Sequence, residues 1–245
     1  FNLHGGGLWD LYVYNKRWLN KLFSVADDIV SPSLFLQREF SQVGYSIQYL
    51  PNAIDYQKFP FKEGRECNFK ILWVRAFAPE YHPELAVKTL FEVRKTFENA
   101  TLTMIGPDKG MLNEIEKLIH DLKLENNVFI LGAIPNVQLF EYFHSHQVFI
   151  NTTQYESFGI ANLEAAACGI PIVSTNVGEI PYLWTNNINI LLIDHFDEVE
   201  MSKSIKIFFE DEKISRMIAN NAFENSKSFS QEVVKKQWIR ILNLK

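Results

Sequence analysis

From about residue 67 onward, the sequence alternates between short apolar runs and amphipathic segments, and this alternation restricts the fold more than any other feature. The apolar runs have the length of strands and are bounded by turn residues. The segments between them place apolar residues at helical spacing, as Ala86, Leu90 and Val93 do. Apolar strands that alternate with amphipathic helices are typical of an α/β fold, in which helices cover both faces of a parallel sheet. We predict strands at 69–74, 101–105, 128–131, 148–150, 170–174 and 189–193.

The first 50 residues repeat this pattern in a shorter form, with predicted strands at 1–4, 28–31 and 47–50 and helical patterns between them. A polar stretch with proline and glycine follows Pro51-Asn52 and indicates a boundary between two α/β units. A last amphipathic segment carries Trp238, which needs an apolar surface to pack on, so we expect this helix to cross back to the first unit. The opening strand lacks the preceding strands that an open parallel sheet needs, so we also expect upstream sequence. We divide the chain into a partial domain at 1–52, a complete domain at 53–228 and a crossing helix at 229–245.

Composition excludes several other classes of protein. The formal net charge of −5 argues against a general nucleic-acid-binding surface, which would be basic. The two cysteines form no C-x-x-C pair, which fits a reducing compartment, and we expect a cytoplasmic protein. No apolar run is long enough for a transmembrane helix. The histidines form no H-E-x-x-H pattern and no Asp-x-Asp pair occurs, so we predict no metal site and expect His144 and His146 to be solvated.

The segment 155–173 carries the most chemical information. A predicted strand ends near Asn151, a polar turn follows, and a helix begins near Gly159. The start of a helix presents unpaired N–H groups and a partial positive charge, which suit a diphosphate, and ligands of open parallel sheets bind at the carboxyl ends of strands. Glu156 on the turn can point into a cleft, and Glu164 within the helix can accept hydrogen bonds from two ribose hydroxyls. An isolated pair of glutamates at this spacing would ordinarily be solvated, but the surrounding pattern favours a site.

This segment resembles the E-x7-E signature of glycosyltransferase family 4, which comprises retaining enzymes of the GT-B fold. The matching residues are Glu156, Phe158, Gly159, Glu164, Ala165, Gly169 and Pro171. The flanks also match, at Leu131-Gly132, at 174–178 and at the interdomain crossing Pro51-Asn52. The resemblance implies a GT-B fold: a Rossmann-like, doubly wound parallel sheet at 53–228 that binds the nucleotide sugar, and a partial second α/β domain at 1–52 on the acceptor side.

The resemblance also implies roles for the residues of the signature. The first glutamate of the family contacts the donor sugar near its reacting carbon, which assigns Glu156 to that task. The second holds the ribose, which assigns Glu164. Backbone N–H groups of the turn touch the sugar and the diphosphate, and these would belong to Phe158, Gly159 and Ile160.

Residues outside the signature receive roles in the same way. Arg75 matches the arginine that neutralises the diphosphate and stabilises the leaving group. Ala133 and Ile134 match strand-end residues on which the base stacks. His4, before three glycines, resembles the histidine of the acceptor-side domain that faces the cleft, although a glycine-rich turn with a bystander histidine is an alternative interpretation.

Two positions depart from the family pattern. A lysine normally accompanies the arginine, but residues 76–83 contain none, so Arg75 and backbone N–H groups act alone, or His82 or a residue elsewhere contributes. Glu179 stands where many relatives have a glycine, in a region that can line the donor site.

The function implied is retaining transfer of a sugar from a nucleotide diphosphate sugar, such as a UDP- or GDP-sugar, to a glycan or lipid-linked acceptor. The reaction would need no metal and no other cofactor, and the protein would touch the inner face of the membrane peripherally. Two alternatives stay open: a nucleotide-sugar epimerase or phosphorylase of related fold, which product analysis would distinguish, and a non-catalytic nucleotide-sugar-binding protein, which a turnover assay would identify.

Overall fold

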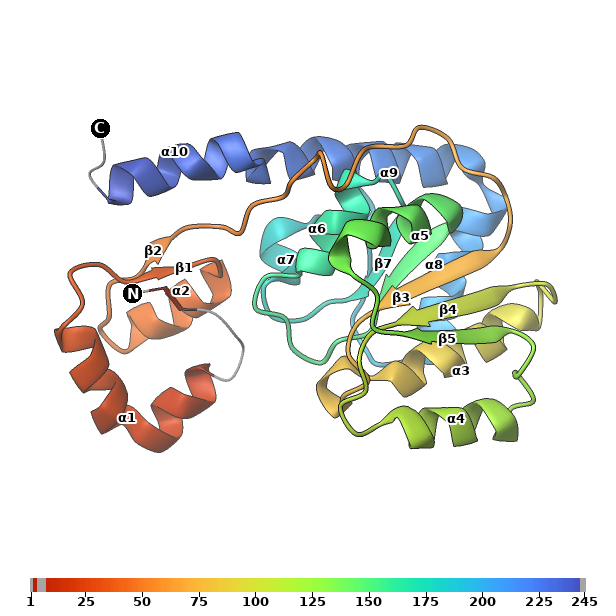
Figure 1. The fold of residues 1–245 in the computed structure, drawn as a ribbon, viewed down its shortest axis with the longest axis horizontal. Coiled ribbons are helices and arrows are strands. Elements are labelled where there is room, and N and C mark those ends of the chain that lie inside the picture. Colours follow the sequence, from red (N-terminus) through yellow and green to blue (C-terminus); the bar gives the residue numbers. More distant parts are fainter. Residues whose placement is uncertain (1, 4–7, 243–245) are drawn as a thin grey trace.

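The computed structural model describes residues 2–3 and 8–242, with the side chains of 8–14 excepted. The predicted site residue His4 lies outside the described residues. Figure 1 shows two bodies: a small one formed by the beginning of the chain, and a large one built around a six-stranded sheet. A helix near the end of the chain runs along the top of the view from the large body to the small one.

The large body contains the predicted parallel sheet, and the α/β prediction is confirmed. Its strands lie in the order β5-β4-β3-β6-β7-β8, and every neighbouring pair is parallel. The chain moves outward from β3 to β5 and then returns to form β6 on the other side of β3, which is the doubly wound topology. The strands are β3 (Lys70–Val74), β4 (Thr101–Ile105), β5 (Val128–Gly132), β6 (Val148–Asn151), β7 (Ile172–Thr175) and β8 (Leu191–Ile193).

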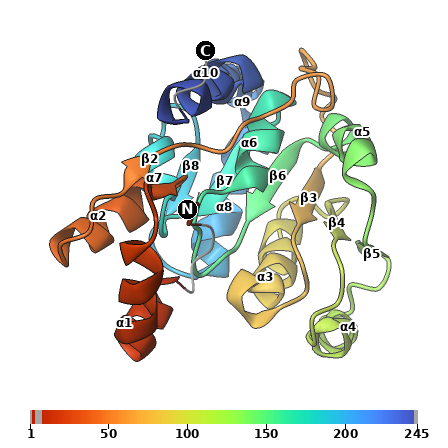
Figure 2. The same cartoon turned by 60° about the vertical axis from the view of Figure 1, so that its left-hand side comes forward.

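Helices cover both faces of this sheet because its strands are apolar on both sides. Ile71 and Trp73 of β3 point into the core beneath one face, and Leu72 between them points into the core of the other face. One face carries α3 (Pro83–Arg94), α4 (Leu112–Asp121) and α8 (Glu198–Glu210), and the other carries α5 (Leu139–Ser145), α6 (Ile160–Ala167), α7 (Ile180–Leu183) and α9 (Glu212–Ser226). Figures 1 and 2 show the two layers from two directions.

The small body has its own short sheet, separate from the large one. The small body consists of α1 (Leu8–Ser24), β1 (Val30–Ser31), α2 (Leu34–Gln42) and β2 (Gln48–Tyr49). The two strands are parallel, and Asn2 forms a further parallel bridge to Val30. Leu19, Phe23, Leu36 and Phe40 form the core between the two helices and the strands.

The last helix, α10 (Gln231–Ile241), reaches the small body. Its Val234 packs with Val30 and Leu50, and the half-buried Trp238 and Ile241 lie against this cluster. Three short 3-10 turns complete the chain: η1 (Pro79–Tyr81), η2 (Asn136–Gln138) and η3 (Lys227–Phe229). The contacts of α10 agree with the expected crossing helix, while the division of the chain at 52/53 and 228/229 stays a prediction.

The expectation that both histidines are solvated is wrong for His146, and His144 is half-buried with its Nε2 2.7 Å from the Pro60 carbonyl oxygen. His146 is buried, its Nδ1 lies 2.7 Å from the Tyr142 carbonyl oxygen and its Nε2 lies 2.8 Å from Thr103 Oγ1. Burial lowers the pKa of His146 to about 4, so it is a neutral core residue. Within the described part of the chain, no helix has the length and apolar character needed to cross a membrane.

Candidate active site

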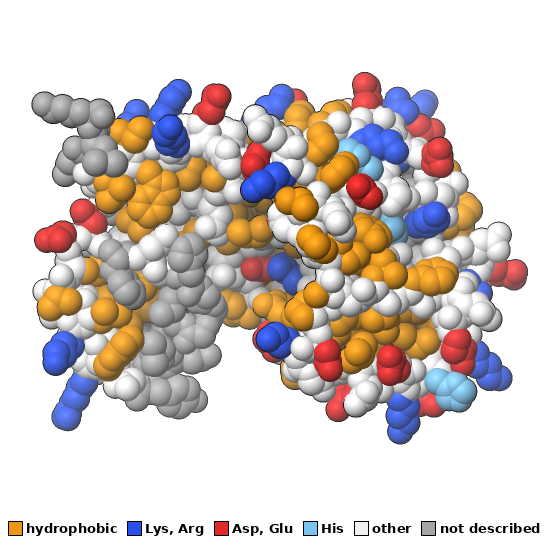
Figure 3. Space-filling view, viewed as in Figure 1, with side chains coloured by type: hydrophobic (Ala, Val, Ile, Leu, Met, Phe, Trp, Pro, Cys, Tyr) orange, Lys and Arg blue, Asp and Glu red, His pale blue; other side chains and the backbone are white. Residues whose placement is uncertain are grey.

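Two of the predicted site residues, Arg75 and Glu156, lie beyond the carboxyl ends of β3 and β6, where the order of the sheet reverses. Arg75 directly follows β3, and the turn that carries Glu156 follows β6. Ligands of doubly wound sheets bind at this reversal, because the two adjacent crossovers leave on opposite faces and open a crevice between them. Figure 3 shows that the two bodies are separated by an indentation on the face viewed there.

Arg75 and Glu156 form an ion pair, in which Nη2 of Arg75 donates to Oε2 of Glu156. Their side chains are only 15% and 10% exposed. Nε of Arg75 also approaches Oδ1 of Asn151 at 3.4 Å, and the ring of Tyr81 lies 5.4 Å from the guanidinium carbon. The guanidinium is therefore held in one orientation from three sides, which prepares it to meet a charged group without a further loss of side-chain entropy.

The turn after Glu156 leads into the start of α6. Gly159 caps this helix with φ +89°, a left-handed conformation that favours glycine, and a Cβ there would lie 3.4 Å from Cγ of Glu156. Phe158 is buried against Phe229, so only its backbone can reach a ligand, whereas Ile160 is 44% exposed. The predicted contact through backbone N–H groups at 158–160 is thus compatible with the geometry and stays a prediction.

Glu164 lies inside α6 and is only 7% exposed, so the alternative of a surface helix residue does not apply. Its Oε1 accepts a hydrogen bond from Nδ2 of Asn136 at 3.0 Å. Burial raises the pKa of Glu164 to about 7, although the hydrogen bond from Asn136 and the charge of Arg75 act in the opposite direction. A carboxylate that is costly to ionise, with few neighbouring donors, is prepared to accept hydrogen bonds from ligand hydroxyls.

A cavity of about 200 Å³ lies beside Arg75 at the carboxyl ends of β3, β4 and β5. Arg75, Ala133 and Ile134 line it together with Ile105, Pro107 and other apolar groups. The structure therefore brings the predicted base-stacking residues to the same cavity as the predicted diphosphate arginine. An apolar cavity with one cation at its rim has the composition of a site for a planar base attached to an anionic group.

The segment in which the family pattern has a lysine, residues 76–83, is held in place by hydrogen bonds. η1 is fastened to the loop after β6, because Thr152 Oγ1 donates to the Tyr81 carbonyl at 2.6 Å and Gln154 N donates to the Glu80 carbonyl at 2.8 Å. His82 ends this turn, with its ring nitrogen against the Gln154 side chain and its ring 4.8 Å from that of Phe196. Gln154 and Phe196 are thus the partners of the His82 ring, and the suggestion that His82 replaces the lysine stays a prediction.

The side chain of Glu179 points to the start of α2 in the small body, although its place in the sequence suggested the donor site. Its carboxylate is fully buried and accepts hydrogen bonds from Ser33 and from backbone N–H groups at the start of α2. The side chain of Glu179 therefore contacts the small body.

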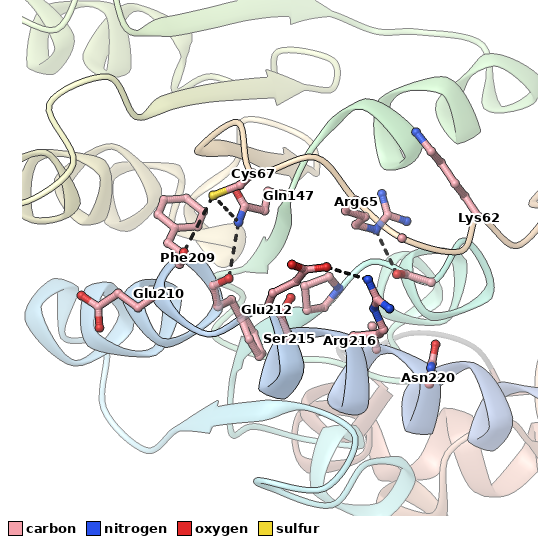
Figure 4. A pocket seen from close by; sticks show the side chains of 15 residues that line it. Lys62, Arg65, Cys67, Gln147, Phe209, Glu210, Glu212, Ser215, Arg216 and Asn220 are labelled. Atoms are coloured by element: carbon pink, nitrogen blue, oxygen red, sulfur yellow. Dashed lines mark hydrogen bonds and ion pairs between the residues drawn. The ribbon is translucent and has the colours of Figure 1, made fainter.

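A second cavity of about 240 Å³ lies at the opposite, amino-terminal ends of β3, β6 and β7 (Figure 4). Arg65 lines it, but its guanidinium donates to backbone carbonyl groups, among them those of Gly169 and Cys168. Arg65 thus fastens the segment before β3 to the loop between α6 and β7. Because the ligand sites of parallel sheets lie at the carboxyl ends of the strands, we assign the functional site to the cavity beside Arg75 rather than to this one.

Sequence reasoning missed three supporting residues: Asn136, Asn151 and Tyr81. Asn151 ends the apolar run of β6 with a polar residue, and Asn136 follows the predicted base-stacking residues, so both carried a positional signal. Tyr81 carried none, because its contact with Arg75 depends on how η1 folds back. Among the described residues, no group of three or more histidine, cysteine, aspartate or glutamate side chains is arranged to hold a metal.

Comparison with solved structures defines the class of fold. Anabaena HepE in complex with UDP and glucose superposes with a TM-score of 0.87 at 20% identity, covering 100% of this chain and 71% of that one. S. aureus TarM gives a TM-score of 0.83 at 17% identity, covering 93% of this chain and 46% of that one. These are GT-B glycosyltransferases, and the predicted GT-B fold is confirmed.

The family follows from the sequence. The model of the family described as glycosyl transferases group 1 matches residues 55–225, and the chain belongs to this family. Among curated relatives, poly(glycerol-phosphate) alpha-glucosyltransferase of Bacillus subtilis is 28% identical over 159 residues, which is 64% of this chain and 23% of the relative. One subunit of the phosphatidylinositol N-acetylglucosaminyltransferase of Arabidopsis thaliana is 28% identical over 144 residues, 58% of this chain and 32% of the relative. The matches thus span a quarter to a third of these relatives.

Proposed function

We propose that this chain is the donor-binding part of a retaining glycosyltransferase of family 4 that takes its sugar from a nucleotide diphosphate sugar. The observation that carries the proposal is the placement of Arg75, which pairs with Glu156 on the turn before α6 and also lines the cavity with Ala133 and Ile134. In this proposal Arg75 and the start of α6 hold the diphosphate, and the apolar recess holds its base. Glu164, deeper along α6, completes the arrangement as the group for the ribose.

Related proteins support this choice of donor. Anabaena HepE, which resembles this chain in fold, has been solved with UDP-glucose, and pneumococcal GtfA, an O-GlcNAc transferase, with UDP and GlcNAc. The names of the relatives specify a poly(glycerol-phosphate) acceptor in one case and phosphatidylinositol in another. By analogy we propose a glycan or lipid-linked acceptor, with peripheral contact between the protein and the inner face of the membrane in the cytoplasm.

The mechanism follows from how charge develops during transfer. When the bond between the anomeric carbon and the diphosphate breaks, negative charge grows on the leaving phosphate and positive charge on the sugar ring. Arg75 has five N–H donors, and those on Nε and Nη2 are directed to Asn151 and Glu156. We assign the remaining donors of Arg75, together with the N–H groups at the start of α6, to the leaving phosphate. Glu156 balances Arg75 and stands near the reacting carbon.

In this mechanism the protein's own groups neutralise the diphosphate, so we propose that donor binding needs neither a metal ion nor another cofactor. The affinity for the nucleotide sugar should then be the same in EDTA and in Mg²⁺ or Mn²⁺. Titration calorimetry under the three conditions measures this directly. Binding that disappears in EDTA and returns with either cation would overturn metal independence without affecting the assignment of the site.

The proposal as a whole is tested by calorimetry with UDP, GDP, ADP and their common sugar derivatives. We expect one nucleotide series to bind, and Arg75→Gln to weaken that binding roughly tenfold or more, the effect of losing a charged hydrogen bond. Arg216→Gln is a matched control, because Arg216 also pairs with a glutamate, Glu212, but lies on α9 beside the second cavity. Equal losses in both variants, or no binding of any nucleotide, would contradict the proposal.

Product analysis then separates the alternatives. Transfer to an acceptor with the anomeric configuration of the donor retained supports the proposal. Conversion of the nucleotide sugar without acceptor would identify an epimerase, and a requirement for free phosphate would identify a phosphorylase. Tight binding without any turnover, for a protein that includes the whole acceptor-side domain, would favour the non-catalytic alternative.

A further inference from the structure

The carboxylate of Glu179 joins the two bodies of the molecule. It is 0% exposed, although it belongs to the short connection between β7 and α7. Its Oε2 accepts hydrogen bonds from Ser33 Oγ at 2.8 Å and from the backbone N–H of Phe35 at 2.7 Å, and its Oε1 accepts one from the N–H of Leu34 at 2.9 Å. All three donors lie at the start of α2 in the small body, where unpaired N–H groups and the helix dipole favour a negative charge.

The start of α2 is thus capped by a side chain of the large body as well as by its own Ser33. Ser33 is the residue that caps α2 locally, because its Oγ accepts a hydrogen bond from the N–H of Leu36 at 3.0 Å. The same hydroxyl donates a hydrogen bond to Glu179, so one serine connects the cap of the helix to the carboxylate of the large body. Burial raises the pKa of Glu179, while the three hydrogen bonds lower it, so the cost of burying the charge is offset only as long as α2 stays in place.

Two further contacts surround this connection. Arg38 of α2 lies with Nη1 3.3 Å from the hydroxyl of Tyr182 in α7. Phe35 of α2 packs edge-on against Tyr155, with 5.9 Å between the ring centroids. Tyr155 immediately precedes Glu156, so the interface of the two bodies borders the turn on which the candidate site is built.

The backbone around Glu179 is also interlocked with the Glu156 turn. The N–H of Glu179 donates to the carbonyl oxygen of Glu156 at 2.9 Å. Gly178 has φ +55°, and a Cβ at this position would lie 2.2 Å from the same carbonyl oxygen, so only glycine permits this approach. The residue that holds the small body through its side chain therefore holds the backbone of Glu156 through its N–H group.

We propose that Glu179 is a positioning residue that fixes the Glu156 turn relative to the small body, so that the donor site and the acceptor-side domain are held in one mutual arrangement. Its catalytic meaning rests on the proposed function, because Glu156 is the group assigned to the donor sugar. Glu179 acts on the reaction only through the turn of Glu156. The coupling itself is a property of the unliganded protein and can be tested without donor or acceptor.

Hydrogen exchange on the full chain, without nucleotide, tests the coupling across the two bodies. Ser33→Ala removes one of the three hydrogen-bond donors of the small body. Glu179→Gln removes the negative charge of the group that accepts all three hydrogen bonds. We expect both variants to speed exchange roughly tenfold or more at the amides of residues 34–36, and also in residues 154–160 on the other side of the interface. Ser33→Thr, which keeps the hydroxyl, should restore the slow exchange of both segments.

Asp197→Ala provides the matched control, because alanine cannot cap a helix. Asp197 also caps a helix, by accepting from the N–H groups of Val199 and Glu200 at the start of α8, but it makes this contact within the large body. The Asp197 variant should speed hydrogen exchange at the start of α8 and leave the exchange of residues 154–160 unchanged. Faster exchange confined to 34–36 in both Ser33→Ala and Glu179→Gln would overturn the proposal, since Glu179 would then be a local cap only. Failure of the proposed function would instead appear as absent nucleotide binding, whatever the exchange result.

Discussion

Replacing Glu164 by glutamine should stabilise the unliganded protein at neutral and alkaline pH. The pKa of Glu164 is raised from 4.5 to about 7, so ionising this carboxyl is harder in the folded than in the unfolded chain. The stability that the protonated form contributes is present below pH 4.5 and is lost as the pH rises through about 7. The shift corresponds to about 3 kcal/mol at pH 8, because one pKa unit equals about 1.4 kcal/mol. Glutamine carries no charge and keeps an oxygen for Asn136, so the variant avoids this loss.

Urea unfolding at pH 5 and pH 8, in buffer without nucleotide, measures the effect. We expect Glu164→Gln to match the wild type at pH 5 within about 1 kcal/mol and to exceed it at pH 8 by about 3 kcal/mol. Glu116→Gln, at an exposed position of α4, is the control and should change neither value. A Glu164→Gln variant that is equally or less stable than the wild type at pH 8 would refute the reasoning, because the carboxylate would then be well accommodated without a ligand.

Three other variants test separate contacts of the molecule. Asn136→Ala removes the hydrogen bond that lowers the pKa of Glu164, so nucleotide-sugar affinity at pH 7 should fall roughly tenfold. Unchanged affinity in calorimetry would show that Asn136 does not contribute to the site. Gly159→Ala forces a side chain into a left-handed conformation, and we expect a loss of about 1–2 kcal/mol in urea unfolding; a neutral result would mean that the turn relaxes freely. Trp238→Ala removes a half-buried ring from the contact of α10 with the small body, which should cost about 1.5–3 kcal/mol, whereas a change below about 0.5 kcal/mol would show that α10 is held by other contacts.

The sheet could be predicted from the sequence because each of its strands is mainly apolar and bounded by turns. The six predicted strands occur in the structure, with shifts of one or two residues at several ends. The strand predicted at 170–174 begins at Ile172, since Pro171 has no N–H group to donate to a neighbouring strand. The convergence of Arg75 and Glu156 was also predictable, because both follow strands whose carboxyl ends meet at the reversal of the sheet.

Partners that depend on tertiary packing could not be predicted. Glu179 lies 146 residues from Ser33 in the sequence, and nothing in its neighbourhood indicates that it caps a helix in another domain. His146 looks like a surface residue at a helix end, yet the folding of β4 beside it buries its ring against Thr103. Likewise the raised pKa of Glu164 depends on how deeply α6 is covered, which no local pattern contains.

The central claim is that a nucleotide diphosphate binds at the carboxyl ends of β3 and β6, and a crystal structure with the nucleotide selected by calorimetry tests it most directly. We expect the diphosphate within hydrogen-bonding distance of Arg75 and the start of α6, the ribose hydroxyls on Glu164, and the base beside Ala133 and Ile134. A nucleotide found instead in the cavity beside Arg65, at the opposite ends of the strands, would contradict the claim.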